Sequence, residues 1–219
     1  MKKIVIAIAA IFIFASFSGC VEKDKEPPYI KISIDGKENN GWYRSNVTIK
    51  INAIDNKSGI KEVKYRLDWD IWKDYIKPVV IRENGEHLFE YYAKDKNGNI
   101  AYRNVTIKID KIKPKISFEN FEPGYLYFRG KKYPILRIPK DTMIVGKMDI
   151  IVNANDSISG IQKVEFYLGK KIILSLEKQP YRWSIDKTIG VYNITALAYD
   201  NAGNINSITI PNVQIFIMR

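Results

Sequence analysis

Residues 52–63 read NAIDNKSGIKEV, and residues 153–164 repeat them as NANDSISGIQKV. Each copy is followed by a second shared stretch, AKDKNGNI at 93–100 and AYDNAGNI at 198–205. Two linked motifs that recur in the same order indicate two copies of one structural unit. A chain of 219 residues is long enough for two such units, each with a core of its own.

Apolar residues alternate with polar ones through both units, which is the pattern of β-strands with one buried face. In the first unit the alternating runs occupy residues 30–34, 47–53, 63–67, 89–93 and 105–109. Asn-Gly and Asp-Gly pairs, which favour tight turns, separate the runs. No helical periodicity follows Pro27. About seven short strands in such a unit predict an all-β fold, an antiparallel β-sandwich.

Proline-containing stretches mark the start of each unit. Pro27-Pro28 precedes the first strand pattern and Lys113-Pro114 precedes its repeat, so we expect domains over 28–110 and 111–219. The second domain carries an insertion near 119–147 that contains Tyr125 and Tyr127. This insertion could form a hairpin covering the edge of the sandwich or an exposed aromatic contact surface. Edge cover is favoured, because open sheet edges promote aggregation.

The N-terminal residues have the features of an export signal. A basic start is followed by the apolar run 4–19, which as a helix would be about 24 Å long, against roughly 30 Å for a bilayer core. We therefore predict a signal peptide over 1–19. FSGC at 17–20 resembles the lipobox of prokaryotic lipoproteins, which implies that Cys20 is lipidated. Charged residues 20–27 would then tether the domains to the outer side of the cell membrane. The alternative is an uncleaved signal anchor.

Several spaced motifs resemble bacterial and archaeal immunoglobulin-like repeats of surface proteins. They are GWY at 41–43, DNKSGI at 55–60, WKDY at 72–75 and DKNGN at 95–99, with SGI at 159–161, PYRW at 180–183 and DNAGN at 200–204 in the second unit. The resemblance covers nearly everything after Pro27. It implies two tandem immunoglobulin-like antiparallel β-sandwich domains. Such modules serve as spacers, adhesive units and accessory domains of enzymes.

The aspartates of the two shared stretches form one candidate site in each unit. Asp55 and Asp95 follow strands that end at the same pole of a sandwich, and Asp156 and Asp200 repeat the arrangement. Carboxylates gathered there could bind calcium, which takes six to eight oxygen ligands. An aspartate before Ser-Gly or Gly-Asn also caps a tight turn. Turn capping is favoured, because neither stretch has the dense spacing of a dedicated calcium loop, and we expect no cofactor.

The sequence carries no recognisable catalytic device. His87 is the only histidine, and no nucleophile motif such as Gly-x-Ser-x-Gly accompanies it, so a structural role is favoured. Metal sites with two histidines are excluded by count. Cys20, the only cysteine, belongs to the export motif. We therefore expect a protein that is not an enzyme.

Exposed aromatic rings are the candidate contact residues. In the resemblance Trp42 and Trp72 occupy recurring framework positions, which favours packing. Trp69 lies in Asp68-Trp69-Asp70, where a hairpin turn is expected, and is the best candidate for an exposed contact. Together with Tyr125 and Tyr127 of the insertion it would contact a protein or glycan of the cell envelope.

Five Asn-x-Ser/Thr sequons are possible glycan acceptors on an exported archaeal protein. They begin at Asn46, Asn56, Asn104, Asn155 and Asn193. In a chain this rich in asparagine, several of them are expected by chance.

The net charge of +11 is spread along the chain without a dense basic run, which favours an ordinary solvated surface. With no helix to enter a groove, and with an export signal, nucleic acid is not an expected partner. The sequence thus predicts a lipid-anchored, extracytoplasmic, non-catalytic module for binding or adhesion. The alternatives are a structural spacer of the envelope or an accessory subunit of a separate surface enzyme.

Overall fold

The computed structural model describes residues 23–134 and 141–218. The predicted signal peptide (1–19) and Cys20 lie outside the described residues. Every described element of regular structure is a β-strand, so the all-β prediction is confirmed. Among the same residues there is no helix with the length and apolar character needed to cross a membrane.

The first unit contains nine strands, two of which form a short hairpin near residue 40. They are β1 (Tyr29–Asp35), β2 (Glu38–Asn39), β3 (Trp42–Tyr43), β4 (Val47–Ile54), β5 (Ile60–Leu67), β6 (Lys73–Asp74), β7 (Val79–Ile81), β8 (Gly85–Asp95) and β9 (Ile100–Ile109). A three-stranded sheet, β1-β4-β7, faces a six-stranded sheet, β2-β3-β9-β8-β5-β6.

The second unit repeats this plan. Its strands are β10 (Lys115–Phe118), β11 (Tyr125–Phe128), β12 (Lys131–Pro134), β13 (Thr142–Val145), β14 (Met148–Asn155), β15 (Ile161–Leu168), β16 (Lys171–Leu176), β17 (Tyr181–Ile185), β18 (Ile189–Asp200) and β19 (Ile205–Phe216). The sheets are β10-β14-β17 and β12-β11-β13-β19-β18-β15-β16. The order matches that of the first unit, except that the β11–β12 hairpin stands at the edge position that β2 occupies in the first unit.

The sheets are antiparallel, as predicted, except for three parallel strand pairs at that edge. β3 pairs with β9, β11 with β13, and β13 with β19 in parallel. Parallel pairing arises because the chain enters the large sheet at its edge after crossing from the small sheet. All other strand pairs are antiparallel. The inserted hairpin therefore lengthens the sheet edge of the second unit.

Each unit has a separate core made by the alternating residues of its strands. On β5 and β8 the inward pairs are Val63 with Ala93, Tyr65 with Tyr91, and Leu67 with Phe89. Phe89 and Ala93 are fully buried, as are Phe166, Ile194, Ala196 and Ala198 in the second unit. The two buried clusters share no residue, one lying within 30–109 and the other within 121–217. Burial of these side chains is the main stabilising contribution in each sandwich.

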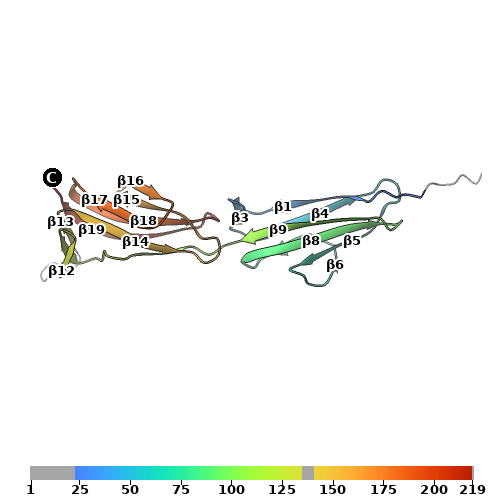
Figure 1. Cartoon of the computed structure of the whole chain (residues 1–219), viewed down its shortest axis with the longest axis horizontal. Coiled ribbons are helices and arrows are strands. Elements are labelled where there is room, and N and C mark those ends of the chain that lie inside the picture. Colours follow the sequence, from blue (N-terminus) through green and yellow to red (C-terminus); the bar gives the residue numbers. More distant parts are fainter. Residues whose placement is uncertain (1–22, 135–140, 219) are drawn as a thin grey trace, which may run out of the picture.

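The two units lie end to end, with the chain passing from β9 into β10 between them (Figure 1). Polar contacts cross this junction. Asn39 donates from Nδ2 to the Asn201 carbonyl oxygen at 2.9 Å, and Arg44 donates from Nη1 to the Gly203 carbonyl oxygen at 3.1 Å. Asp110, directly after β9, accepts from the hydroxyl of Ser159 at 2.6 Å. The described N-terminal residues lie at the opposite pole of the first unit.

Candidate functional site

The predicted turn role of the repeated aspartates is present in the structure. Asp55 Oδ1 accepts hydrogen bonds from the amides of Ser58 at 2.7 Å and Gly59 at 2.6 Å. Gly59 has a φ of 78°, which a residue with a side chain adopts only with strain. These bonds, that from Gly59 first, lower the pKa of the Asp55 carboxyl. In the second unit Asp156 caps the same turn, accepting from Ser159 and Gly160 at 2.9 Å each.

The second aspartate of each unit closes the following turn. Asp95 accepts from the Asn99 amide at 2.8 Å and from Asn99 Nδ2 at 2.6 Å. Asp200 accepts from Asn204 in the same way, at 2.8 Å for both bonds. Both carboxylates are fully buried. Burial raises the pKa of Asp200, with hydrogen bonds from Asn204 opposing it.

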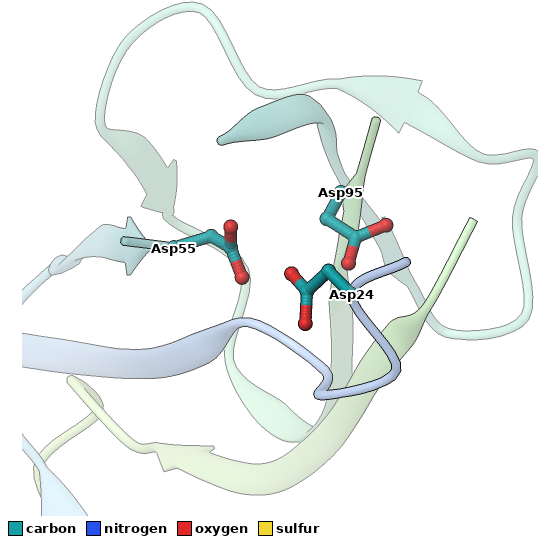
Figure 2. A group of neighbouring side chains, drawn as sticks. All are labelled: Asp24, Asp55 and Asp95. Atoms are coloured by element: carbon teal, nitrogen blue, oxygen red, sulfur yellow. The ribbon is translucent and has the colours of Figure 1, made fainter. Parts of the chain in front are cut away.

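A third aspartate joins each pair, and sequence analysis missed both of these residues. Asp24 lies with Asp55 and Asp95, and Asp110 lies with Asp156 and Asp200. In each group one carboxylate oxygen per residue lies within 4.8 Å of the others. Figure 2 shows the side chains of Asp24, Asp55 and Asp95 pointing toward one another. We call these groups the first and the second acidic triad.

A weak sequence signal for the missing aspartates exists. Asp24-Lys25-x-x-Pro28 recurs as Asp110-Lys111-x-x-Pro114, directly before the first strand of each unit. Asn99 Nδ2 donates to the Asp24 carbonyl oxygen at 3.1 Å, and Asn204 Nδ2 donates to that of Asp110 at 3.0 Å. Residues 24–28 are therefore held on the pole of the first unit. Within the described end of the predicted tether (20–27), Asp24 packs against the first unit and is only 7% exposed.

Trp69 lies at the tip of a tight turn, as predicted, and its side chain is 71% exposed. Asp68 and Trp69 have φ values of 50° and 65°, and the amide of Asp70 donates to the carbonyl of Leu67 at 3.0 Å. Two successive residues with positive φ make this a type I′ turn. It presents the Trp69 side chain outside the first sandwich.

The Trp69 ring belongs to a cluster on the outer face of the large sheet. The Arg66 guanidinium lies 5.1 Å from the ring centroid of Trp69 and 4.8 Å from that of Trp72. Trp72 also contacts Tyr92, with ring centroids 4.8 Å apart, and Tyr102, at 6.4 Å. We call these five residues the aromatic platform. Trp72, for which packing was predicted, is half-buried, and it shares the Arg66 guanidinium with the exposed Trp69.

A buried carboxylate, that of Glu90, orients two residues of the aromatic platform, Arg66 and Tyr102. Arg66 donates from Nε to Glu90 Oε2 at 2.6 Å and from Nη2 to Oε1 at 2.9 Å, and the Tyr102 hydroxyl also donates to Glu90. Glu90 is 2% exposed. The bonds from Arg66, followed by that from Tyr102, lower the pKa of Glu90. A two-pronged arginine–carboxylate pair of this kind orients the guanidinium as well as neutralising its charge.

His87 has the structural role that its sequence context favours. It is 9% exposed, its Nδ1 lies 2.7 Å from Asp68 Oδ2, and its Nε2 lies 3.1 Å from the carbonyl oxygen of Glu83. The other oxygen of Asp68 accepts from the Leu88 amide at 2.8 Å. His87 and Leu88 thus anchor the first residue of the turn that presents Trp69.

The insertion does not supply the pair of contact tyrosines that was predicted. Tyr127 is 1% exposed, and its hydroxyl bonds to the backbone of Glu122, so it is a core residue of the second unit. The prediction is wrong for Tyr127 because β11 lies between β12 and β13 and is not the edge strand of the sheet. Tyr125 is half-buried, with Lys132 Nζ 4.0 Å from its ring centroid.

All five sequon asparagines have exposed side chains and are accessible to a modifying enzyme. They are Asn46, Asn56, Asn104, Asn155 and Asn193. Their modification stays a prediction.

One family model matches part of the second unit. Residues 139–196 match the family model described as a bacterial Ig domain. This part of the chain is similar to bacterial Ig domains. The resemblance to immunoglobulin-like repeats is thereby confirmed, through a match that covers about a quarter of the whole chain and lies in the second unit. No curated protein matches the chain with significance.

Solved structures that match most of the chain include two with several modules or domains. Fibronectin(III)-like modules of CbhA from Clostridium thermocellum share 16% identity, with 85% of this chain and 94% of that chain covered and a TM-score of 0.44. Three N-terminal domains of the outer capsid protein Hoc of bacteriophage RB49 share 10% identity, with 88% and 71% covered and a TM-score of 0.45. At these values the neighbours say nothing about a ligand of this chain.

Proposed function

We propose that this chain is a non-catalytic binding module on the outer side of a cell membrane, and that its aromatic platform binds a glycan of the cell envelope. The observation that carries the proposal is that the exposed Trp69 ring and the half-buried Trp72 ring share one guanidinium, that of Arg66, at 5.1 and 4.8 Å from the ring centroids. Flat rings offer apolar contact to the faces of sugar rings, and an arginine offers donors to their hydroxyl groups.

Preorganisation supports a binding role for this surface. The turn that carries Trp69 is held by Asp68 through its bonds to His87 and Leu88, and Arg66 is held by Glu90. A surface whose side chains are already ordered loses less conformational entropy when a ligand binds. Aromatic residues and arginine also dominate the binding energy at known interfaces.

The proposed location rests on the N-terminal sequence. A signal peptide over 1–19 and a lipid on Cys20 would place both sandwiches outside the membrane, close to its surface. The similarity of the second unit to bacterial Ig domains agrees with a protein of the cell surface. The intact mass of the protein extracted from membranes tests this part: it should equal the chain from Cys20 plus lipid, and a mass equal to the full 219 residues would contradict it.

A structural spacer is the second candidate, and the junction favours it. Asn39, Arg44 and Asp110 each bond to the following unit, which limits bending between the sandwiches. A spacer would hold a separate partner at a fixed distance from the membrane. Under this function the platform would have no ligand of its own.

A glycan-binding assay distinguishes the binding module from the structural spacer. The full chain, solubilised in detergent, is applied to an array of bacterial and archaeal surface polysaccharides, and hits are measured by tryptophan fluorescence titration. Trp69→Ala should weaken binding about tenfold or more, as loss of a central aromatic contact does. Tyr133→Ala removes an aromatic residue that is 44% exposed on the second unit and should bind like the unaltered chain. No binding to any glycan would favour the spacer, and glycan binding that survives Trp69→Ala unchanged would contradict the aromatic platform as the binding site.

A further inference from the structure

One carboxylate oxygen of the first acidic triad is buried without a donor. Asp24 is 7% exposed, and its Oδ1 accepts from the Glu26 amide at 3.0 Å. Its Oδ2 receives no hydrogen bond from the described residues. The side chain points toward Asp55 and Asp95 (Figure 2). A buried charged oxygen without a partner costs free energy, so this oxygen requires a cation or another donor.

The second triad shows how the same position is satisfied elsewhere in the chain. Asp110 Oδ1 accepts from the Ile112 amide at 2.9 Å, just as Asp24 Oδ1 accepts from Glu26. Asp110 Oδ2, however, accepts from both the hydroxyl and the amide of Ser159, at 2.6 and 3.1 Å. The corresponding Ser58 directs its hydroxyl to Asp55 Oδ1 instead, at 3.2 Å. Asp24 Oδ2 in the first triad therefore lacks, among the described residues, the donor that Asp110 Oδ2 has in the second. We call the first triad open and the second closed in this sense.

Protein cations do not neutralise the first triad. Among the described residues, no lysine, arginine or histidine forms an ion pair with Asp24, Asp55 or Asp95. The nearby Lys57 pairs with Glu26 at 2.9 Å, and both of these side chains are largely exposed. Three carboxylates held this close repel one another, and a positive ion between them would remove the repulsion.

We propose that Asp24, Asp55 and Asp95 bind a calcium ion. The available ligands are hard oxygens without sulfur or imidazole, which suits calcium. Two oxygens on opposite sides of one calcium ion lie about 4.6–5.2 Å apart, given bonds of 2.3–2.6 Å. The oxygens of the triad lie within 4.8 Å of one another. Magnesium demands a near-ideal octahedron and gives up its bound waters reluctantly, so three carboxylates held by the chain suit it less well than calcium.

Turn capping and ion binding are compatible here. The capping donors of Asp55 all meet its Oδ1, which leaves Oδ2 for an ion. Asp55 is only half-buried, so water from that side can complete the coordination shell. The turns thus hold the carboxylates in place before the ion arrives.

The site would fasten the N-terminal segment to the first sandwich. Asp24 belongs to the segment that precedes β1, whereas Asp55 and Asp95 belong to the sandwich itself. An ion shared among them links the residues after Cys20 to the pole of the first unit. Calcium outside the cell would then stiffen the connection between the membrane anchor and the binding module, a consequence that rests on the proposed lipid anchor.

Isothermal titration calorimetry on the detergent-solubilised full chain tests the site, starting from protein treated with EDTA and using calcium chloride alone. We expect one calcium ion per chain, a higher thermal midpoint with calcium, and a much weaker response to magnesium. Asp24→Asn keeps the size of the side chain and should weaken calcium binding about tenfold or more, because a charged ligand is lost. Asp35→Asn, an exposed aspartate at the end of β1, is the matched control and should bind normally.

Two results would overturn the proposal: no heat and identical midpoints with calcium and EDTA, or unchanged calcium binding by Asp24→Asn. Far-ultraviolet circular dichroism in EDTA verifies that each variant is folded. If Asp24→Asn does not fold, Asp55→Asn provides the same test, because an asparagine oxygen can still cap the turn. Since glycan binding by Trp69 is measured separately, failure of one proposal leaves the other standing.

Discussion

The two acidic triads have nearly the same hydrogen bonds, but the second triad is closed by a serine donor and the first is open. In the second unit Ser159 donates to Asp110, the aspartate that arrives from the preceding unit. In the first unit no described donor reaches the equivalent Asp24 Oδ2. A repeated motif can therefore serve as a joint between units in one copy and as a candidate ion site in the other.

The outer faces of the two large sheets also differ in what their buried carboxylates bind. In the second unit Glu165 accepts from Lys163 at 2.6 Å and from the hydroxyls of Tyr167 and Tyr199 at 2.9 Å each. The tyrosine hydroxyls are thus occupied by a carboxylate of the chain itself. In the first unit Glu90 holds Arg66, and the rings of Trp69 and Trp72 lie outside that pair. Among the described residues, a buried carboxylate and an exposed tryptophan occur together on the outer face of the first unit alone.

The largest expected effect tests whether the two cores are independent. Phe166→Ala should destabilise the second unit by about 3–5 kcal/mol, because a fully buried ring is replaced by a cavity. The equivalent Tyr65→Ala should cost the first unit less, since Tyr65 is half-buried. Hydrogen exchange measured by mass spectrometry at increasing urea concentration reports each unit separately. Equal loss of protection in both units of Phe166→Ala would show that they unfold together.

The next prediction concerns the closed pole. Ser159→Ala should lower the free energy of unfolding of the second unit by about 1–3 kcal/mol, because Asp110 Oδ2 loses its hydroxyl donor. Ser58→Ala is the matched control and should cost less, since its hydroxyl makes one longer bond to a half-buried carboxylate. Urea denaturation followed by tryptophan fluorescence measures both. Equal losses would mean that the two poles are energetically alike.

Acid sensitivity is expected to arise at the buried carboxylate of each outer face, with a smaller effect on stability. The pKa of Glu90 is lowered by the bonds from Arg66 and Tyr102, so its folded pKa lies below its unfolded value. Such a group stabilises the fold above the unfolded pKa and loses this contribution as the pH falls through the folded pKa. Burial raises the pKa of Glu165, but the bonds from Lys163, Tyr167 and Tyr199 outweigh it and the net pKa is lowered.

Thermal midpoints between about pH 6 and pH 3 should therefore fall less steeply in Glu90→Gln than in the unaltered chain. Glu165→Gln should flatten the acid response in the same direction. Exposed Glu86→Gln, whose partner Lys108 is also on the surface, is the control and should change little. A steeper acid response in Glu90→Gln would contradict the assigned pKa direction.

The smallest stability effect is expected at Trp69. Trp69→Ala should change the free energy of unfolding by no more than about 0.5–1 kcal/mol, the value of an exposed cation–π contact. Trp183→Ala, which removes a tryptophan that is 6% exposed, should cost about 3–5 kcal/mol. Thermal and urea unfolding of both variants make the comparison. A large loss of stability in Trp69→Ala would assign that ring to the framework and weaken its proposed role in binding.

Most of the fold could be predicted from local sequence. The alternation at Phe89, Tyr91 and Ala93 determines which face is buried, because successive side chains of a strand point to opposite faces. The two-residue strands and the parallel pairing at the sheet edge could not be predicted. Short strands carry no period of their own, and pairing direction depends on which sheet the chain enters.

The candidate sites were predicted in part. Trp69 was placed at an exposed turn because Asp-Trp-Asp interrupts a strand pattern. Tyr127 was misjudged, because the burial of β11 depends on its pairing with β13. Asp24 and Asp110 were missed, because each is far in sequence from the aspartates that it joins.

The sequence by itself determined that the chain is a β-protein with two copies of one unit, because strand periodicity and turn chemistry act between near neighbours. It also determined the turn-capping role of Asp55 and Asp95. Only the tertiary structure decided that a third aspartate enters each pole and that the first pole keeps an unpaired oxygen. The reason is that the partners of a buried charge are set by packing between distant segments, which no local pattern records.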